Sequence, residues 1–331
     1  MSQAFIPVIH SIPSGEALIE IVLPHYPIGK PLSCQIYKRG LNDTYLVETE
    51  KERYILRVYR RGWRTKEEIQ FELELLAFLH HTNQPIAYPI GREDGSFTTE
   101  IDAPEGKRYA AVFSYAPGRA VNEKLDSRQS QRLGEVLATI HLTIDRFKSN
   151  CRRPELNCEY LLDKSLQAIA SVYQHRSSDI NYLESQVEQL KRQVETLGLP
   201  DFPPAYGICV GDVHAGNAHF NQQNQPTLFD FDQCGYSWRA FDIAKFIHKA
   251  RIDKIDATVR NSFLEGYQSI RPLDAVEIAS IPLFIKVAHI WVMGISASVV
   301  GDVLPYGWFT DDWLERRLAT LKSLDDANNG K

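Results

Sequence analysis

The chain has 331 residues, of which 44% are hydrophobic and 24% are charged, and its formal net charge at pH 7 is −5. This length allows two lobes or domains with a substantial core, and the composition is that of an ordinary globular protein. The negative charge, together with the lack of a basic block with interleaved aromatic residues, argues against a nucleic-acid partner. The five cysteines have no CxxC or CxxH spacing, which argues against structural zinc and suits a reducing compartment.

Two segments bear on targeting. The stretch from Met1 to Pro13 lacks the basic region and the long apolar region of a signal peptide. The longest apolar stretch, residues 278–300, contains Pro282, Lys286 and His289, so it predicts a core helix and not a membrane span. The sequence therefore predicts a cytoplasmic protein that has no membrane partner.

The first third of the chain predicts strands around a single helix. Runs of β-branched and aromatic residues predict strands at 33–38, 44–48, 53–59, 97–101 and 108–115. Thr65, with Glu68 three residues later, has the pattern of a capping box and predicts a helix that continues to about His80.

The composition changes after Ala116-Pro117-Gly118-Arg119, and helical periodicity dominates from there on. Helices are expected at 127–147, 157–173 and 178–197 and over most of 240–324. This order predicts an α+β fold with a small β-rich N-terminal lobe, residues 1–115, and a larger helical C-terminal lobe, residues 116–331. A ligand is expected in the cleft between such lobes.

Residues 206–232 interrupt the helices with short strands and polar turns. Strands are expected at 206–210, 218–220 and 227–231, with a hairpin loop at 221–226. Asp212 and Asn217 have the D-x-x-x-x-N spacing of a kinase catalytic loop, and Asp230 follows thirteen residues after Asn217. Any one of these residues alone is more often a turn former, but together they predict a phosphoryl-transfer site.

Val210-Gly211-Asp212-Val213-His214-Ala215-Gly216-Asn217 resembles the H-G-D-x-H-x-x-N motif of the aminoglycoside phosphotransferase and choline kinase family. Residues 230–244 look most like the branch that contains stress response kinase A and type II homoserine kinases. The departure is Val210, where the family usually has His. The resemblance implies a protein-kinase-like two-lobe fold that uses ATP and Mg²⁺. It makes Asp212 the catalytic residue and Asn217 and Asp230 the metal ligands.

The same resemblance assigns roles elsewhere in the chain. The turn Gly40-Leu41-Asn42-Asp43-Thr44 is expected to cover the nucleotide phosphates through its backbone N–H groups. Arg57, where the family usually has Lys, is expected to reach the phosphates and to pair with Glu72. Ser114 and Tyr115 belong to the segment whose backbone is expected to contact the adenine edge. His214 and Asp242 are expected to support the loop.

The acceptor stays open at this point, since both a protein Ser/Thr and a small hydroxylated metabolite such as homoserine, choline or an aminoglycoside fit the motif. An alternative from another class is a non-catalytic pseudokinase that binds nucleotide and acts as a regulatory or interaction module. Arg57 and Val210 favour that alternative, whereas the retained Asp212, Asn217 and Asp230 oppose it. A metal-dependent hydrolase is disfavoured because the H-x-H and H-E-x-x-H spacings are missing.

Overall fold

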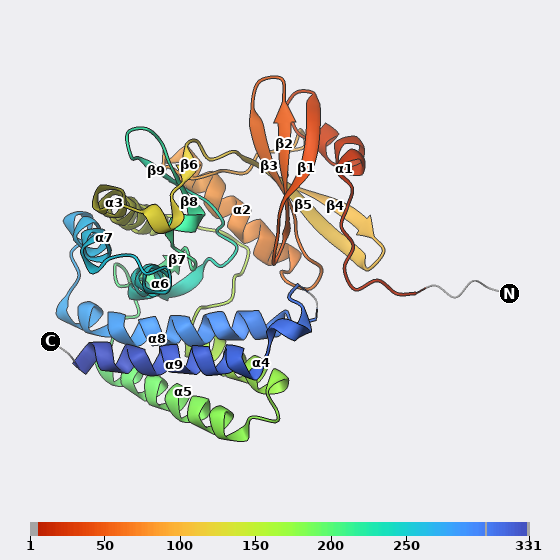
Figure 1. The fold of residues 1–331 in the computed structure, drawn as a ribbon. Coiled ribbons are helices and arrows are strands. Elements are labelled where there is room, and N and C mark those ends of the chain that lie inside the picture. Colours follow the sequence, from red (N-terminus) through yellow and green to blue (C-terminus); the bar gives the residue numbers. More distant parts are fainter. Residues whose placement is uncertain (1–5, 302, 330–331) are drawn as a thin grey trace. The chain divides into compact units, whose positions relative to one another are not determined.

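The described residues of the computed structural model, 6–301 and 303–329, divide into two units. The first unit runs to His81 and adds Ile86–Ala116 and Ser149–Arg152. The second unit contains Thr82–Pro85, Pro117–Lys148 and the chain from Arg153 onward. The first unit is rich in strands and the second in helices (Figure 1), which confirms the α+β class expected from the sequence.

The first unit is built on an antiparallel five-stranded sheet with the order β1-β2-β3-β5-β4. Its elements are α1 (Gly15–Ile21), the 3₁₀ turn η1 (Leu23–His25), β1 (Pro31–Arg39), β2 (Asp43–Thr49), β3 (Arg53–Val58), α2 (Lys66–His81), β4 (Thr98–Ala103) and β5 (Gly106–Ser114). Thr65 and Glu68 form the expected capping box of α2, since each side chain accepts a hydrogen bond from the backbone N–H of the other residue.

The alternation of side chains along β3 separates the core from the polar face of the sheet. Leu56 and Val58 point into a cluster with Leu18 and Val22 of the α1 region, and all four are buried. Arg57 lies between them and therefore projects from the opposite face of the sheet. The sequence reasoning missed α1, which Ser14 caps by accepting a hydrogen bond from the backbone N–H of Ala17.

The second unit combines two small sheets with a helical core. Its elements are β6 (Arg119–Ala120), η2 (Asn122–Lys124), α3 (Ser127–Ile144), the π-helix η3 (Glu159–Asp163), α4 (Lys164–Val172), α5 (Ser177–Leu197), β7 (Tyr206–Cys209), η4 (Ala215–Asn217), β8 (Ala218–Phe220), β9 (Pro226–Leu228), β10 (Gly235–Trp238), α6 (Ala240–Ile252), α7 (Ala257–Ile270), α8 (Ala275–Ser298), η5 (Tyr306–Trp308) and α9 (Asp311–Asn329). Antiparallel pairing joins β6 to β8, β8 to β9, and β7 to β10.

Glycines let α3 and α7 pack backbone to backbone. A Cβ atom on Gly134 would lie 2.1 Å from the carbonyl oxygen of Phe263, and one on Gly266 would lie 2.1 Å from that of Gln131. Any larger residue at either position would therefore push the two helices apart. This tight contact fixes α3, which carries His141 toward the loop that follows β7.

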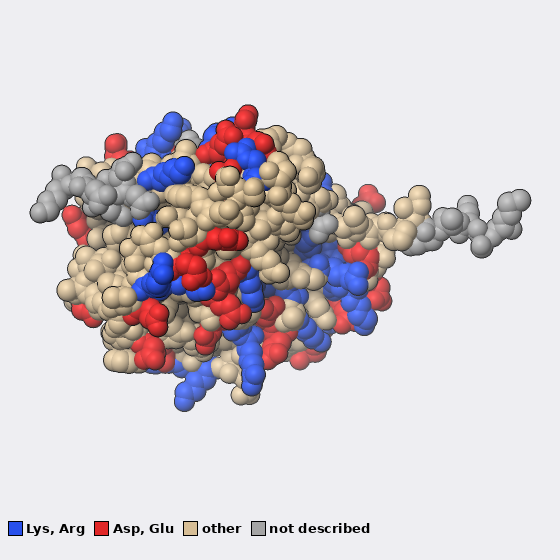
Figure 2. All heavy atoms as spheres, turned by 90° about the horizontal axis from the view of Figure 1, so that it is seen from below, with Lys and Arg blue, Asp and Glu red and all other residues tan. Residues whose placement is uncertain are grey.

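Helix α8 is long and apolar enough to cross a membrane, and it alone meets that test within 6–301 and 303–329. Two-thirds of its most apolar stretch is buried within the protein, as is usual for the core helix of a globular fold. On the face of the molecule in Figure 2, Lys and Arg side chains are interspersed with Asp and Glu side chains.

The strand expected at 227–231 is shorter than the sequence suggested. Strand β9 ends at Leu228, and Asp230 has a left-handed backbone with φ of 66°. Asp230 and Asp232 therefore do not share one face of a continuing strand, because a left-handed residue breaks the two-residue alternation of side chains. Strand β10, which the sequence reasoning also missed, then returns to pair with β7.

Candidate active site

The loop that carries Asp212 is held in place by the side chain of Asp242, at the start of α6. The carboxylate of Asp242 accepts hydrogen bonds from the backbone N–H groups of Val210 (2.7 Å) and Gly211 (2.8 Å). Gly211 has φ of 86°, and a Cβ atom there would lie 2.0 Å from the carbonyl oxygen of Gln233. Only glycine fits this turn, so the loop conformation is tightly specified by the sequence.

Asp212 projects from this turn beside a buried lysine that the sequence reasoning missed. The Nζ atom of Lys245, from α6, lies 2.5 Å from Oδ1 of Asp212, and the lysine side chain is only 4% exposed. His214 lies 3.6 Å from the other carboxylate oxygen. Burial favours the neutral acid, but the charge of Lys245 and the contact with His214 outweigh it and hold the pKa of Asp212 far below its usual range. The carboxylate is therefore ionised at any physiological pH.

Asn217 lies against the same carboxylate. Its amide nitrogen donates to the backbone oxygen of Asp212 at 3.0 Å and to Oδ2 of Asp212 at 3.3 Å. Within the part of the chain that the structure describes, no donor contacts Oδ1 of Asn217, so that oxygen is available to a cation. His214 supports the turn as expected, because its Nδ1 accepts from the backbone N–H of Gly216 at 3.0 Å.

Sheet register brings Asp230 next to Asn217. Ala218 pairs with Leu228 across β8 and β9, and the backbone N–H of Phe229 donates to the carbonyl oxygen of Asn217 at 3.0 Å. Asp230 follows at once and is half-buried. Asp232, in contrast, is buried, and Arg153 donates to its backbone oxygen. The structure thus places an amide oxygen and a carboxylate, both hard donors of the kind Mg²⁺ prefers, at the ends of adjacent strands.

In the first unit, Arg57 and Glu72 form the ion pair expected from the sequence. Nη1 of Arg57 lies 2.8 Å from Oε1 of Glu72, and the hydroxyl of Tyr59 lies 3.3 Å from the other carboxylate oxygen. Both charged residues are buried. Thr44 is the direct cross-strand neighbour of Arg57 in the pairing of β2 with β3. Thr44, the last residue of the β1–β2 turn, therefore lies beside Arg57 on β3.

The other residues of that turn have internal partners. The carboxylate of Asp43 is buried and contacts Arg108 at 2.7 Å and His10 at 3.0 Å, while the side-chain oxygen of Asn42 accepts from the backbone N–H of Arg60. Gly40 closes the turn by donating to the carbonyl oxygen of Asn42, and Leu41 is half-buried at its tip. Because the side chains of Asn42 and Asp43 are engaged within the protein, a ligand at this turn would be bound by backbone N–H groups.

The segment expected to face an adenine ring ends β5. The backbone N–H of Ser114 donates to the carbonyl oxygen of Tyr88 at 2.9 Å. The hydroxyl oxygen of Ser114 accepts from the backbone N–H of Tyr88 at 3.0 Å. The guanidinium of Arg53 lies 4.2 Å from the ring centroid of Tyr115. Both residues belong to the first unit, together with Arg57 and Glu72.

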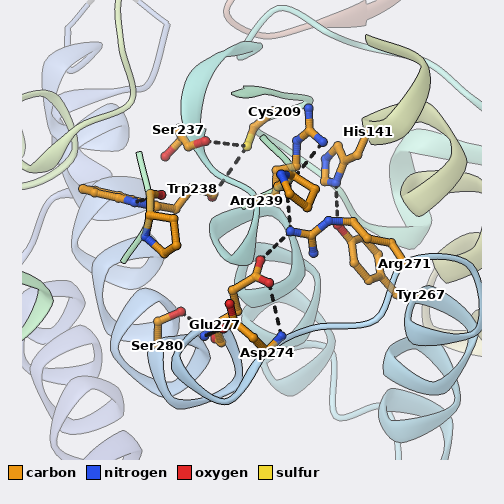
Figure 3. Close-up of polar contacts among 12 residues, drawn as sticks. His141, Cys209, Ser237, Trp238, Arg239, Tyr267, Arg271, Asp274, Glu277 and Ser280 are labelled. Atoms are coloured by element: carbon orange, nitrogen blue, oxygen red, sulfur yellow. Dashed lines mark hydrogen bonds and ion pairs between the residues drawn. The ribbon is translucent and has the colours of Figure 1, made fainter. Parts of the chain in front are cut away.

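A buried polar network surrounds His141, Tyr267, Arg271 and Glu277 (Figure 3). His141 contacts Asp242 at 3.0 Å and the hydroxyl of Tyr267 at 2.8 Å, and the nearby Arg271 pairs with Glu277 at 2.5 Å. His141, Cys209 and Asp242 lie close enough together to hold a metal ion, but their polar atoms are already engaged. Burial raises the pKa of the Cys209 thiol well above its usual value, which disfavours the thiolate that a metal needs. The cluster is therefore a structural brace.

Comparison with protein-family sequence models identifies the family of this chain. The sequence model of the phosphotransferase enzyme family matches residues 35–277, which include both the Arg57–Glu72 pair and the Asp212 loop. The chain belongs to this family. The resemblance noted from residues 210–244 is thereby confirmed, and the kinase-like fold with it.

Three similar proteins illustrate the relationship. An uncharacterized protein of Synechocystis is 42% identical over 96% of this chain and 87% of its own length. A homoserine kinase of Agrobacterium fabrum is 26% identical over 79% of this chain and 78% of its own length. An amicoumacin kinase in complex with AMP-PNP, Ca²⁺ and Ami has the same fold, with a TM-score of 0.73 and 21% identity over 94% of this chain and 91% of that one.

Proposed function

We propose that this family member transfers the γ-phosphoryl group of ATP to the hydroxyl of a small acceptor molecule. The observation that carries the proposal is the environment of Asp212. A partly exposed carboxylate is fixed between Lys245 and Asn217 on the motif turn, and its oxygens are oriented by both neighbours. Phosphoryl transfer is catalysed mainly by positioning and by electrostatic stabilisation, which is what such an arrangement supplies.

The role of Asp212 follows from its charge state. A carboxylate with so low a pKa is a weak base, so it would not remove the acceptor proton before the reaction begins. In a loose transition state, the bond between the acceptor oxygen and phosphorus has hardly begun to form. The acceptor hydroxyl therefore keeps its proton until after the transition state, when that bond is completed. Asp212 therefore orients the acceptor hydroxyl and receives its proton as the new ester forms. Lys245 keeps the carboxylate ionised and aligned.

Asn217 and Asp230 would hold Mg²⁺. The free Oδ1 of Asn217 and the carboxylate of Asp230 are oxygen donors of the right kind, and two protein ligands are typical when phosphates and water complete the shell. When bound, the ion neutralises charge on the phosphates. In the first unit, the Arg57 guanidinium and the backbone of the Gly40–Thr44 turn would bind the phosphates, and Ser114 and Tyr115 would flank the base.

The acceptor is proposed to be a hydroxylated amino acid or amino alcohol. Support comes from the similar homoserine kinase and amicoumacin kinase, which are named for small acceptors. A screen can test this: the purified chain, ATP and Mg²⁺ are incubated with pooled amino alcohols and hydroxy amino acids, and ³¹P NMR detects new phosphate esters. A phosphate ester from one pool supports the proposal. The lack of a new phosphate ester in every pool would contradict this choice of acceptor.

The pairing of Asp212 with Lys245 also supports a second candidate, a nucleotide-binding pseudokinase in which the lysine permanently occupies the carboxylate. The two candidates differ in turnover and not in binding. Thermal shifts with ATP, with and without Mg²⁺, should appear in both cases. Only the enzyme should yield ADP in proportion to an added acceptor, whereas a pseudokinase would leave ATP intact with every pool.

A further inference from the structure

A cavity of about 320 Å³ opens between the C-terminal half of α6, the start of α7 and the end of α9. Its volume is within the range of small-molecule sites. All of its lining residues belong to the second unit, and none of them has a part in the proposed phosphoryl transfer. The chemistry of the lining suggests a specific class of ligand.

Two arginines give the cavity its charge. Arg251 and Arg260 both line it, and neither one has a carboxylate partner among the residues whose side chains the structure describes, 6–122, 124–301 and 303–324. The nearest acid in sequence, Asp253, is held by Lys249. Arg260 is fixed by donating to the backbone oxygen of Ile255 at 2.9 Å. Burial and the charge of Arg260 lower the pKa of Arg251, as expected for two guanidinium groups that lie close together.

His248 adds a buried polar atom with no partner. The residue is 3% exposed, lines the cavity, and has no hydrogen bond to its Nδ1 within the described chain. Its tautomer follows from its neighbours. Nε2 of His289 lies 2.9 Å from the carbonyl oxygen of Arg317, so that nitrogen carries the proton and Nδ1 of His289 must accept from Nε2 of His248 at 3.0 Å. Nδ1 of His248 is therefore a bare acceptor, and it needs a donor.

The remaining walls are consistent with an organic ligand that carries a hydroxyl. Thr320 and Ser323 donate their hydroxyl protons to carbonyl oxygens of α9, so both present lone pairs and not protons. Ile252 and Leu324 supply apolar surface. The cavity thus offers two cations for an anion, several acceptors for a hydroxyl and apolar contact for carbon atoms.

We infer that this cavity binds a hydroxylated organic phosphate, with the phosphate on Arg251 and Arg260 and a hydroxyl donating to His248. Paired guanidinium groups bind phosphate through several charge-assisted hydrogen bonds, which makes them stronger partners than single cations. A ligand hydroxyl would give the buried imidazole nitrogen the donor that it needs. The site is separate from the proposed phosphoryl-transfer residues and does not depend on that function.

Isothermal titration calorimetry with glycerol 3-phosphate tests this inference on the full chain. Binding should weaken roughly ten-fold or more in Arg251→Gln and in Arg260→Gln, since each removes charged hydrogen bonds. Arg128→Gln, which removes an exposed charge on α3, is the matched control and should bind as the wild type does. Arg251→Gln should melt no lower than the wild type, because it relieves repulsion between the arginines without removing a hydrogen bond, whereas Arg260→Gln also loses the bond to the backbone oxygen of Ile255.

Three outcomes would overturn the inference. The first is no binding of glycerol 3-phosphate to the wild type. The second is binding that survives both cavity variants but is lost in Arg57→Gln, which would place the phosphate on the residues proposed for the nucleotide. The third is equal affinity for inorganic phosphate and glycerol 3-phosphate, because the hydroxyl and carbon contacts would then contribute nothing. Glycerol alone should not bind.

Discussion

Removing Lys245 or Asp212 should have unequal effects on stability, because the two partners are not equally buried. Lys245 is 4% exposed and Asp212 is 30% exposed. Asp212→Asn leaves a cation in the interior without a counter-charge, whereas Lys245→Met leaves a carboxylate that water can still reach. We expect Asp212→Asn to lower the free energy of unfolding by about 3 kcal/mol and Lys245→Met to lower it by about 1 kcal/mol.

The coupling between the two residues is measured by a double-mutant cycle. Exposed ion pairs contribute about 0.5 kcal/mol, and breaking a fully buried pair costs about 3–5 kcal/mol. This partly exposed pair, with 2.5 Å between Nζ and Oδ1, should lie between those limits, at about 2 kcal/mol. Urea unfolding of the wild type, both single variants and the double variant gives the value. The pair Lys249–Asp253 on the same helix is more exposed and serves as the control, with an expected coupling of about 0.5 kcal/mol.

The same cycle has a pH signature. Because the pKa of Asp212 is lowered in the folded state, its stabilising contribution is present above the unfolded pKa and is lost as the pH falls through the folded pKa. In Lys245→Met the folded pKa should rise, so that loss should move to a higher pH. Single-variant effects that add within about 0.5 kcal/mol, with no acid shift, would refute the reasoning.

Three further predictions concern binding and the loop. Asp230→Ala should weaken ATP binding in the presence of Mg²⁺ more than in its absence in calorimetry, and an equal loss in both conditions would point to folding instead. In steady-state kinetics, Arg57→Ala should raise the Michaelis constant for ATP and lower turnover together. Arg57→Lys should keep much of the wild-type turnover and ATP affinity, because the positive charge remains. A fully active alanine variant would show that Arg57 does not bind the phosphates. Gly211→Ala should cost more than about 2 kcal/mol in urea unfolding, because its Cβ would overlap the carbonyl oxygen of Gln233, and a wild-type midpoint would contradict the turn geometry.

Local patterns were enough to predict several parts of this protein. The capping box of Thr65 and Glu68 depends on residues three apart, and the structure forms it. The pairing of Arg57 with Glu72 was expected from the resemblance to the kinase family, which places a cation on the third strand and a glutamate on the helix that follows, and the structure forms this pair. The turn at Asp212 was predicted from the glycines beside it and the short strands that flank it, which are also local features of the sequence.

Long-range partners could not be read in this way. Lys245 reaches Asp212 from 33 residues away, and only the packing of α6 against the loop brings them together. Its one sequence signal is a lysine among the apolar residues of 241–247, which suggests a buried charge that needs a partner. The left-handed Asp230 was also missed, because an apolar run followed by Asp-Phe-Asp fits a continuing strand equally well. Helix α1 had a serine cap as its only local signal.

We propose that Asp212 directs phosphoryl transfer to an acceptor hydroxyl. The most direct test is the rate of phosphate ester formation by the wild type and by Asp212→Asn, measured with labelled ATP at saturating Mg²⁺ and with the acceptor found in the screen. We expect a rate lower by about a hundred- to ten-thousand-fold in the variant, with ATP affinity nearly unchanged. A variant that forms the ester at the wild-type rate would contradict the assignment of Asp212.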